Sequence, residues 1–191
     1  MKLSRQIRRG WRCFLPGMLV GAALGSVGAH QLVTRDWKSI AAPLETSPML
    51  IREDAKGSGH FGAPRNGERR HKGLDLVAPV GSPVRAIRGG LVIATGAHRG
   101  LGRYLILEHR GGMRSLYAHL EDVKVGVGGR IRQGQVIATV GKTGNAKSSV
   151  ITPHLHLEVA RDGKLLDPET LGLALVDSPD ASDQLTAEGG E

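Results

Sequence analysis

The chain has 191 residues, a formal net charge of +8, a single cysteine and only 3% aromatic residues. This length accommodates one domain with a hydrophobic core plus flanking segments. Residues 1–29 contain only basic charges and residues 177–191 only acidic ones, five of each, so the body between them is itself strongly basic. Such a body suits an anionic partner, but no nucleic-acid motif accompanies it, and we expect no nucleic-acid partner. Because Cys13 is the only cysteine, any metal in the body must be bound by histidine and carboxylate.

The N-terminus has the layout of an export signal. Residues 1–12 are basic, residues 13–29 carry no charge, and Val27-Gly28-Ala29 forms a small-residue cleavage site. The uncharged run is also just long enough to span a membrane, which takes about 17–25 residues. A cleaved signal peptide and a membrane anchor over residues 1–29, with residues 13–29 as the tether, therefore stay open as alternatives. Either one places the body outside the cytoplasm, in the periplasm or elsewhere in the cell envelope.

The middle of the chain is typical of an all-β domain. Residues 30–56 predict a linker, and from residue 57 to residue 170 short apolar runs alternate with glycine-rich turns. Strands of this length and spacing indicate a compact antiparallel barrel or sandwich. The expected strands are residues 73–77, 84–87, 91–95, 104–109, 114–119, 135–140 and 154–160.

Two features follow the last of these strands. Asp162-Gly163 predicts a tight hairpin turn, because these residues adopt the positive φ angles that such a turn requires. Residues 171–191 predict a disordered tail, which is acidic from Asp177 onward.

The strand from His154 to Ala160 has two different faces. Side chains alternate along a strand, so His154, His156 and Glu158 point one way, and Leu155, Leu157 and Val159 point to the core. Two imidazoles on one face can meet a single metal ion, or one can bind metal while the other acts beside it. The residues themselves leave both alternatives open.

Two other segments carry histidines in similar settings. In His71-Lys-Gly73-Leu-Asp75 an even separation places His71 and Asp75 on one face of an extended chain. In Tyr117-Ala118-His119 the alternation predicts that Tyr117 and His119 share a face. Catalytic zinc takes three protein ligands from His and carboxylate and keeps a position for water, whose pKa it lowers toward 7. The chain therefore offers three ligands and two spare histidines.

Three ordered motifs resemble those of the lysostaphin-type, LytM-like zinc metallopeptidases, which cleave peptide bonds in bacterial peptidoglycan. They are His71-Lys-Gly73-Leu-Asp75, Tyr117-Ala118-His119-Leu120 and Pro153-His154-Leu155-His156. Supporting matches lie in Phe61-Gly62 with Arg65, in the residues after Asp75, and in Asp167-Pro168. One stretch departs from the family pattern: the loop from Thr143 to Pro153 is longer than usual and lacks the glycine before its proline.

The resemblance implies a role for each of these residues. His71, Asp75 and His156 would bind Zn²⁺, and His119 and His154 would be the catalytic histidines that do not bind metal. The implied activity is an endopeptidase acting on peptidoglycan peptides, either a stem-peptide crosslink or a glycine bridge. Arg65 would contact substrate or brace the site, and Tyr117 would support the site or form part of a packed wall.

Two other functions are weighed against this one. The first is a non-enzymatic regulator of the same fold that activates another cell-wall hydrolase, with a regulatory protein as partner. Such relatives typically have damaged metal sites, whereas the ligand set here is complete. The second is a biotinyl- or lipoyl-like carrier, suggested by residues 125–137, but the chain shows no lysine in the tight hairpin that a carrier requires.

Overall fold

The computed structural model describes residues 40–179. The predicted export signal or anchor over residues 1–29 lies outside this range, as do residues 180–191. Among the described residues, no helix has the length and apolarity needed to cross a membrane.

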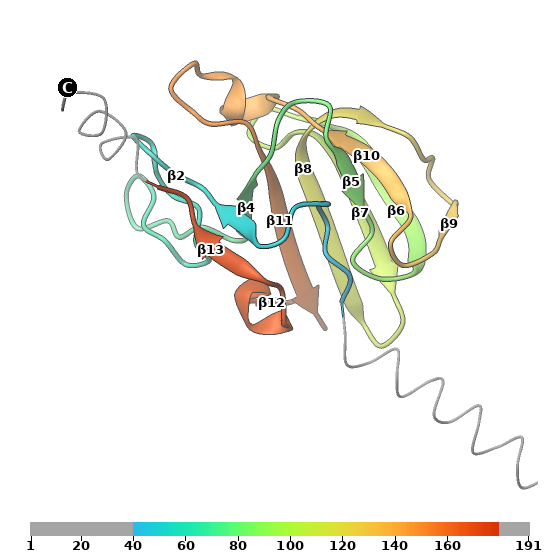
Figure 1. The fold of residues 1–191 in the computed structure, drawn as a ribbon. Helices are drawn as coiled ribbons and strands as arrows, with labels where there is room; N and C mark the ends of the chain where they lie inside the picture. Colours follow the sequence, from blue (N-terminus) through green and yellow to red (C-terminus); the bar gives the residue numbers. More distant parts are fainter. Residues whose placement is uncertain (1–39, 180–191) are drawn as a thin grey trace, which may run out of the picture. The chain divides into compact units, whose positions relative to one another are not determined.

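The described residues form an all-β domain, which confirms the predicted fold class. Eleven strands make one large sheet, in which the order β13-β1-β4-β11-β8-β7-β6-β9 is continuous and β5, β10 and β12 pair beside it (Figure 1). Among the described pairs every one is antiparallel except β1 with β13. The strands are β1 (Met49–Ile51), β4 (Leu74–Val77), β5 (Pro83–Arg85), β6 (Gly90–His98), β7 (Gly102–His109), β8 (Met113–Val123), β9 (Arg130–Ile131), β10 (Val136–Val140), β11 (His154–Arg161), β12 (Lys164–Leu166) and β13 (Leu175–Asp177), with a separate hairpin of β2 (Glu53–Asp54) and β3 (Gly57–Ser58).

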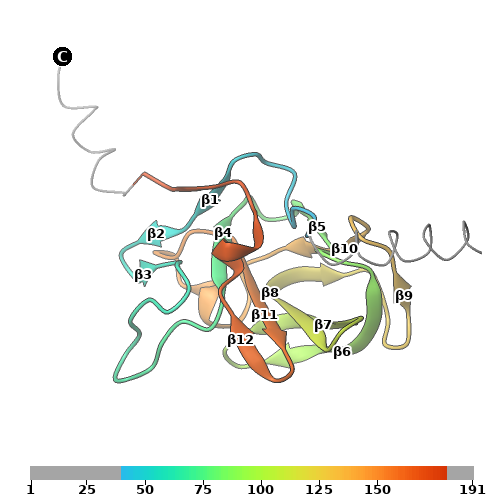
Figure 2. The ribbon, with the colours of Figure 1, turned by 90° about the horizontal axis from the view of Figure 1, so that it is seen from below.

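The core lies on one face of the central strands. On β11, Leu155, Leu157 and Val159 are fully buried, as the alternation predicts. β8 is long enough to pair with β11 through its first half and with β10 near its end. Figure 2 shows β11, β8, β7 and β6 following one another around the curved sheet. This curvature encloses the apolar side chains and leaves the opposite face of β4 and β11 for the histidines.

The hairpin after β11 is confirmed. Arg161 pairs with Lys164, and the two residues between them, Asp162 and Gly163, have φ angles of 50° and 78°. These are the left-handed conformations of a two-residue turn that matches the twist of the strands.

The folded domain extends beyond residues 57–170 at both ends. Met49–Ile51, within the predicted linker, pairs with β4 and also lies parallel to Leu175–Asp177, within the predicted tail. Leu44 and Met49 are only 3% and 1% exposed and belong to the hydrophobic core. A three-residue strand shows too little alternation to be read from sequence, and its partners lie far away along the chain.

Candidate metal centre

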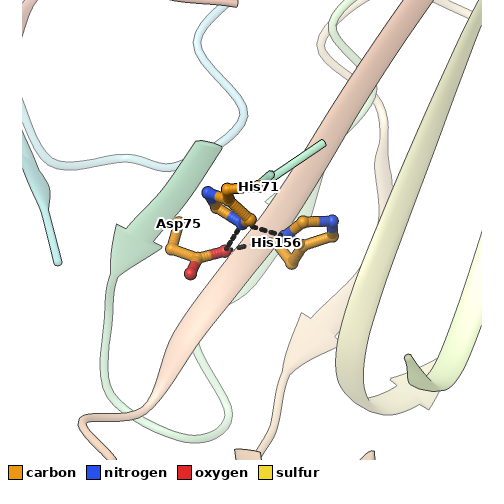
Figure 3. A group of neighbouring side chains, drawn as sticks. All are labelled: His71, Asp75 and His156. Carbon is orange, nitrogen blue, oxygen red and sulfur yellow. Dashed lines mark hydrogen bonds and ion pairs between the residues drawn. The ribbon is translucent and has the colours of Figure 1, made fainter. Parts of the chain in front are cut away.

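Three side chains converge where β4 and β11 lie side by side (Figure 3). Asp75 and His156 are directly opposite each other on these strands, so their side chains share a face. His71 reaches the same point from the segment before β4. Asp75 Oδ1 lies 2.7 Å from His156 Nδ1 and 3.1 Å from His71 Nε2, and the two nitrogens are 3.1 Å apart. Among the described residues these three form the one group that could hold a metal ion.

Gly73 explains how His71 reaches this point. A Cβ atom at residue 73 would lie 2.4 Å from the carbonyl oxygen of Leu157 and 3.0 Å from the His156 ring. Only glycine therefore allows the chain between His71 and Asp75 to press against β11. The glycine of the motif is needed for this close approach of two backbones.

The outer ring nitrogens of His71 and His156 each have a hydrogen-bond acceptor. His71 Nδ1 lies 2.8 Å from the backbone carbonyl oxygen of His60, and His156 Nε2 lies 3.2 Å from Glu158 Oε1. If the outer nitrogens donate to these oxygens, the lone pairs of His71 Nε2 and His156 Nδ1 face the common centre. Such acceptors set the orientation and tautomer of metal-binding histidines in proteins. The carbonyl of His60 carries no sequence signal, whereas the alternation of β11 places Glu158 on the correct face.

Asp75 is held by basic groups on both sides. It is 3% exposed, and burial alone would raise the pKa of its carboxyl group. The hydrogen bond from His156 and the adjacent imidazole of His71 outweigh burial and hold that pKa well below its usual value. Its second oxygen, Oδ2, accepts hydrogen bonds from Arg52 and lies 3.7 Å from Arg65 Nη2. Arg65 thus forms an ion pair with Asp75, and Arg52 is a contact that the sequence does not indicate.

The same interaction acts in the opposite direction on His156. Burial lowers its pKa, but hydrogen bonds to Asp75 and Glu158 more than compensate and raise the pKa to about 9. At neutral pH and without metal, both nitrogens of the His156 ring are therefore protonated, and the cationic ring lies between the carboxylates of Asp75 and Glu158. A metal at Nδ1 must displace that proton, which is the usual competition between protons and metals at histidine ligands.

His119 and His154 lie beside this centre and complete a cluster of four rings. The His119 ring is 4.9 Å from that of His154 and 5.8 Å from that of His156. Each donates from Nδ1 to a backbone carbonyl, His119 to Thr143 at 2.9 Å and His154 to Thr152 at 2.6 Å. The five predicted site residues are thus brought together, and the two ends of the Thr143–Pro153 loop orient the two outer histidines.

Burial keeps both outer histidines neutral. It is the main cause that lowers the pKa of His119 to about 3, and repulsion from His154 and His156 in their protonated forms adds to the effect. Burial also lowers the pKa of His154, against the attraction of Asp75. With Nδ1–H donated to a carbonyl, each ring keeps a free lone pair on Nε2 at neutral pH.

The predicted pairing of Tyr117 with His119 on one strand face is wrong. Tyr117 lies opposite the core residue Leu157, whereas Ala118 lies opposite His156. His119 then has a φ of 60°, which breaks the alternation and turns its ring to the histidine face. Tyr117 is fully buried and accepts hydrogen bonds from Ile87 N and Ser115 Oγ, so it is a packed wall residue.

Comparison with known proteins decides the family. A model of peptidase family M23 matches residues 69–168, more than half of the chain. The chain belongs to peptidase family M23. This family is zinc-dependent, and the matched residues contain all three motifs of this M23 domain.

Two curated relatives illustrate activities named among similar proteins. The DD-carboxypeptidase/endopeptidase Mpg of Neisseria meningitidis serogroup B is 37% identical over 105 residues, which are 55% of this chain and 23% of that protein. The murein hydrolase activator EnvC of Escherichia coli is 36% identical over 109 residues, 57% of this chain and 25% of that protein. The M23 chain thus matches about a quarter of the length of each of these two relatives.

Solved structures confirm the resemblance to lysostaphin-type peptidases. The catalytic domain of lysostaphin from Staphylococcus simulans is 31% identical with a TM-score of 0.53, over 61% of this chain and 90% of that one. A zinc-containing peptidase from Vibrio cholerae is 29% identical with a TM-score of 0.56, over 68% of this chain and 39% of that one.

The three donors of the M23 domain fit a zinc ion in chemistry and spacing. Two imidazole nitrogens and one carboxylate oxygen are a common ligand set of catalytic zinc. Donors bound tetrahedrally at about 2.0–2.1 Å from zinc lie about 3.3 Å apart. The donor triangle has sides of 2.7, 3.1 and 3.1 Å, so two sides need to widen by about 0.2 Å and the Asp75–His156 side by about 0.6 Å.

Proposed function

We propose that this M23 domain is a zinc-dependent endopeptidase that hydrolyses peptide bonds in bacterial peptidoglycan. The observation that carries the proposal is the geometry of the site, where three donors converge within 4.8 Å of one another and two neutral histidines lie beside them. Burying so many ionisable groups opposes folding, which favours a functional role for this set over a purely structural one.

His71, Asp75 and His156 would hold the zinc ion. When bound, zinc supplies a Lewis acid for the scissile carbonyl and lowers the pKa of water so that hydroxide is available near neutral pH. Glu158 and the carbonyl of His60 hold the two imidazoles in the tautomers that present lone pairs to the ion. Arg52 and Arg65 hold the carboxylate of Asp75 from its other oxygen.

His119 and His154 would handle protons and charge during hydrolysis. Each has its Nδ1–H bound to a carbonyl oxygen, so each accepts a proton only at Nε2. An Nε2 that has taken a proton from the attacking water becomes a donor for the departing amine, which is general base and general acid catalysis by one group. A protonated Nε2 also stabilises negative charge on the substrate oxygen.

Several features of the chain support a location in the cell envelope. The basic N-terminus followed by an uncharged run predicts export, with residues 1–29 as a signal peptide or residues 13–29 as a membrane tether. The basic charge of the body between the two ends favours an acidic polymer as partner.

A second candidate function is activation of another cell-wall hydrolase. The observation that favours it is the 36% identity to EnvC, which is named as a murein hydrolase activator. In that case the histidine face would be a remnant, and a second protein would dock elsewhere on the domain. The complete donor set favours the enzyme.

Digestion of purified peptidoglycan by the purified full-length chain distinguishes the endopeptidase function from the activator function. We expect the zinc-loaded protein to release peptides or open crosslinks, identified by mass spectrometry of the products, and a chelator to abolish this release until zinc is restored. Asp75→Ala, treated in the same way, should bind no zinc and release nothing. The masses of the products also identify the bond that is cut.

Two results would overturn the enzyme proposal. One is a protein that takes up no zinc, and the other is a zinc-loaded protein that releases no product from any peptidoglycan tested. If Asp75→Ala and the wild type stimulated an added cell-wall hydrolase equally, the activator function would replace the enzyme proposal.

A further inference from the structure

A buried arginine outside the family-matched segment contacts the metal centre. Arg52 directly follows β1 and is 4% exposed. Its Nη2 and Nε lie 3.1 and 3.3 Å from Asp75 Oδ2, the oxygen that faces away from the histidine ligands. Its backbone N–H also donates to the carbonyl oxygen of Asp75 at 2.9 Å. Arg52 therefore holds both the main chain and the side chain of a metal-ligand residue.

Arg52 is in turn held by a second carboxylate. Its Nη1 lies 2.5 Å from Asp54 Oδ1, in an ion pair without the angles of a hydrogen bond. Both side chains are nearly inaccessible to water, with 5% and 6% exposed. Asp54 Oδ2 accepts the backbone N–H of Thr152 at 3.0 Å, and the carbonyl of Thr152 accepts from His154. A continuous set of contacts thus joins Asp75 to His154.

We infer that Arg52 is a positioning residue of the metal centre, anchored by Asp54, that selects which oxygen of Asp75 faces the metal. This inference rests on the proposed zinc function and extends it to a segment outside residues 69–168. With Oδ2 held by two donors from a planar guanidinium, the carboxylate cannot rotate, and Oδ1 stays at the apex of the donor triangle. A freely rotating carboxylate would lose that arrangement whenever the metal leaves.

Because Arg52 is positively charged, the sign of the change in zinc affinity on its removal tests the inference. A guanidinium near a zinc site repels the cation, so charge alone predicts that its removal strengthens zinc binding. Orientation predicts the reverse, because loss of a partner that orients a ligand typically weakens metal binding about 10–100-fold. The direction of the change in zinc affinity therefore separates the two effects.

Two variants of Arg52 and one control test this. Arg52→Met removes the donors, and Arg52→Lys keeps the charge but loses the planar fork that binds Asp75 and Asp54 together. Arg114→Met is the matched control, because Arg114 also projects from the sheet to a carboxylate, Glu108 at 2.7 Å, but on the exposed surface. Zinc affinity is measured by competition with a chromophoric chelator, well below the thermal unfolding midpoint of each metal-free protein.

We expect Arg52→Lys to bind zinc about 10-fold more weakly than wild type and Arg52→Met about 100-fold, while Arg114→Met binds as wild type does. Arg52→Met leaves the buried carboxylates of Asp54 and Asp75 without their ion-pair partner. If this variant does not fold, the zinc affinity of Arg52→Lys tests the inference. Equal or tighter zinc binding by a folded Arg52→Lys would overturn the inference, as would a lower unfolding midpoint with unchanged zinc affinity, which marks a purely structural role.

Wild-type protein in the same experiment distinguishes a failure of the proposed zinc function from a failure of the positioning role of Arg52. A wild type that binds no zinc overturns the proposed function, and the inference with it. A wild type that binds zinc and cleaves peptidoglycan, with Arg52→Lys indistinguishable from it in affinity, overturns only the role of Arg52.

Discussion

Replacing His119 by Asn should remove a pH-dependent part of the stability of the metal-free domain. His119 is 9% exposed, and burial together with the charges of His154 and His156 lowers its pKa to about 3. Asn is the suitable substitute because residue 119 has a φ of 60°, a conformation that Asn adopts more readily than most residues. The variant therefore keeps the backbone turn and loses the ionisable ring.

The sign and size of the effect follow from the two pKa values. An unfolded histidine has a pKa of about 6.5, so between pH 6.5 and 3 the unfolded chain binds a proton at this residue that the folded domain does not. The contribution of neutral His119 to the free energy of unfolding is therefore complete above pH 6.5. As the pH decreases below 6.5, this contribution decreases by about 1.4 kcal/mol per pH unit. From pH 7.5 to 5.5 the wild type should lose about 1.4 kcal/mol that the variant retains, a measurable part of a typical 5–15 kcal/mol.

Urea unfolding with a chelator present, at several pH values from 5 to 8, measures this difference. The control is Ile137→Val, a fully buried core change that should cost about 0.5–1.5 kcal/mol at every pH. The reasoning fails if the stability difference between wild type and His119→Asn is as flat with pH as that of the control, or grows in the opposite direction.

Three further predictions concern the same site. His156→Ala should lose zinc and hydrolysis together, whereas His154→Ala should lose hydrolysis and keep most of the zinc, as metal analysis after dialysis would show; equal retention in both would refute the division of roles. Gly73→Ala should destabilise the domain by about 1–3 kcal/mol or more in denaturant unfolding, because its methyl group overlaps the β11 backbone. Tyr117→Phe should cost about 1–3 kcal/mol by leaving the Ile87 N–H unpaired, with hydrolysis retained; loss of hydrolysis in a folded variant would contradict its wall role.

Local pattern was enough to predict the central sheet and the histidine-bearing face of β11. β11 shows why: its alternation places His154, His156 and Glu158 on one face, and the structure brings Glu158 to the outer nitrogen of His156. The hairpin at Asp162 was equally local, because the turn residues themselves adopt the required φ angles. The ligand assignment of His156, by contrast, came from family resemblance and not from the alternation.

Features that depend on one unusual residue or on distant contacts could not be predicted in this way. A single left-handed residue at His119 moves its ring to the other face, and no rule of alternation contains it. Arg52 lies in a segment that resembles a linker, and its significance appears only when β1 pairs with β4 and brings it against Asp75. The β1 and β13 strands are themselves too short to show a period.

The longer loop between Thr143 and Pro153 need not disturb the catalytic face, because each of its ends is fixed independently. At its start, Gly144 packs so closely on Gly102 that a Cβ atom on either residue would clash with the backbone of the other segment, and this contact holds the carbonyl of Thr143 that accepts from His119. At its end, Asp54 binds the N–H of Thr152, whose carbonyl accepts from His154. Residues inserted between two fixed points alter what surrounds the site and leave both histidines in place. We therefore expect the departure from the family pattern to affect substrate choice, and the proposed chemistry to depend on the two histidines that the loop orients at its ends.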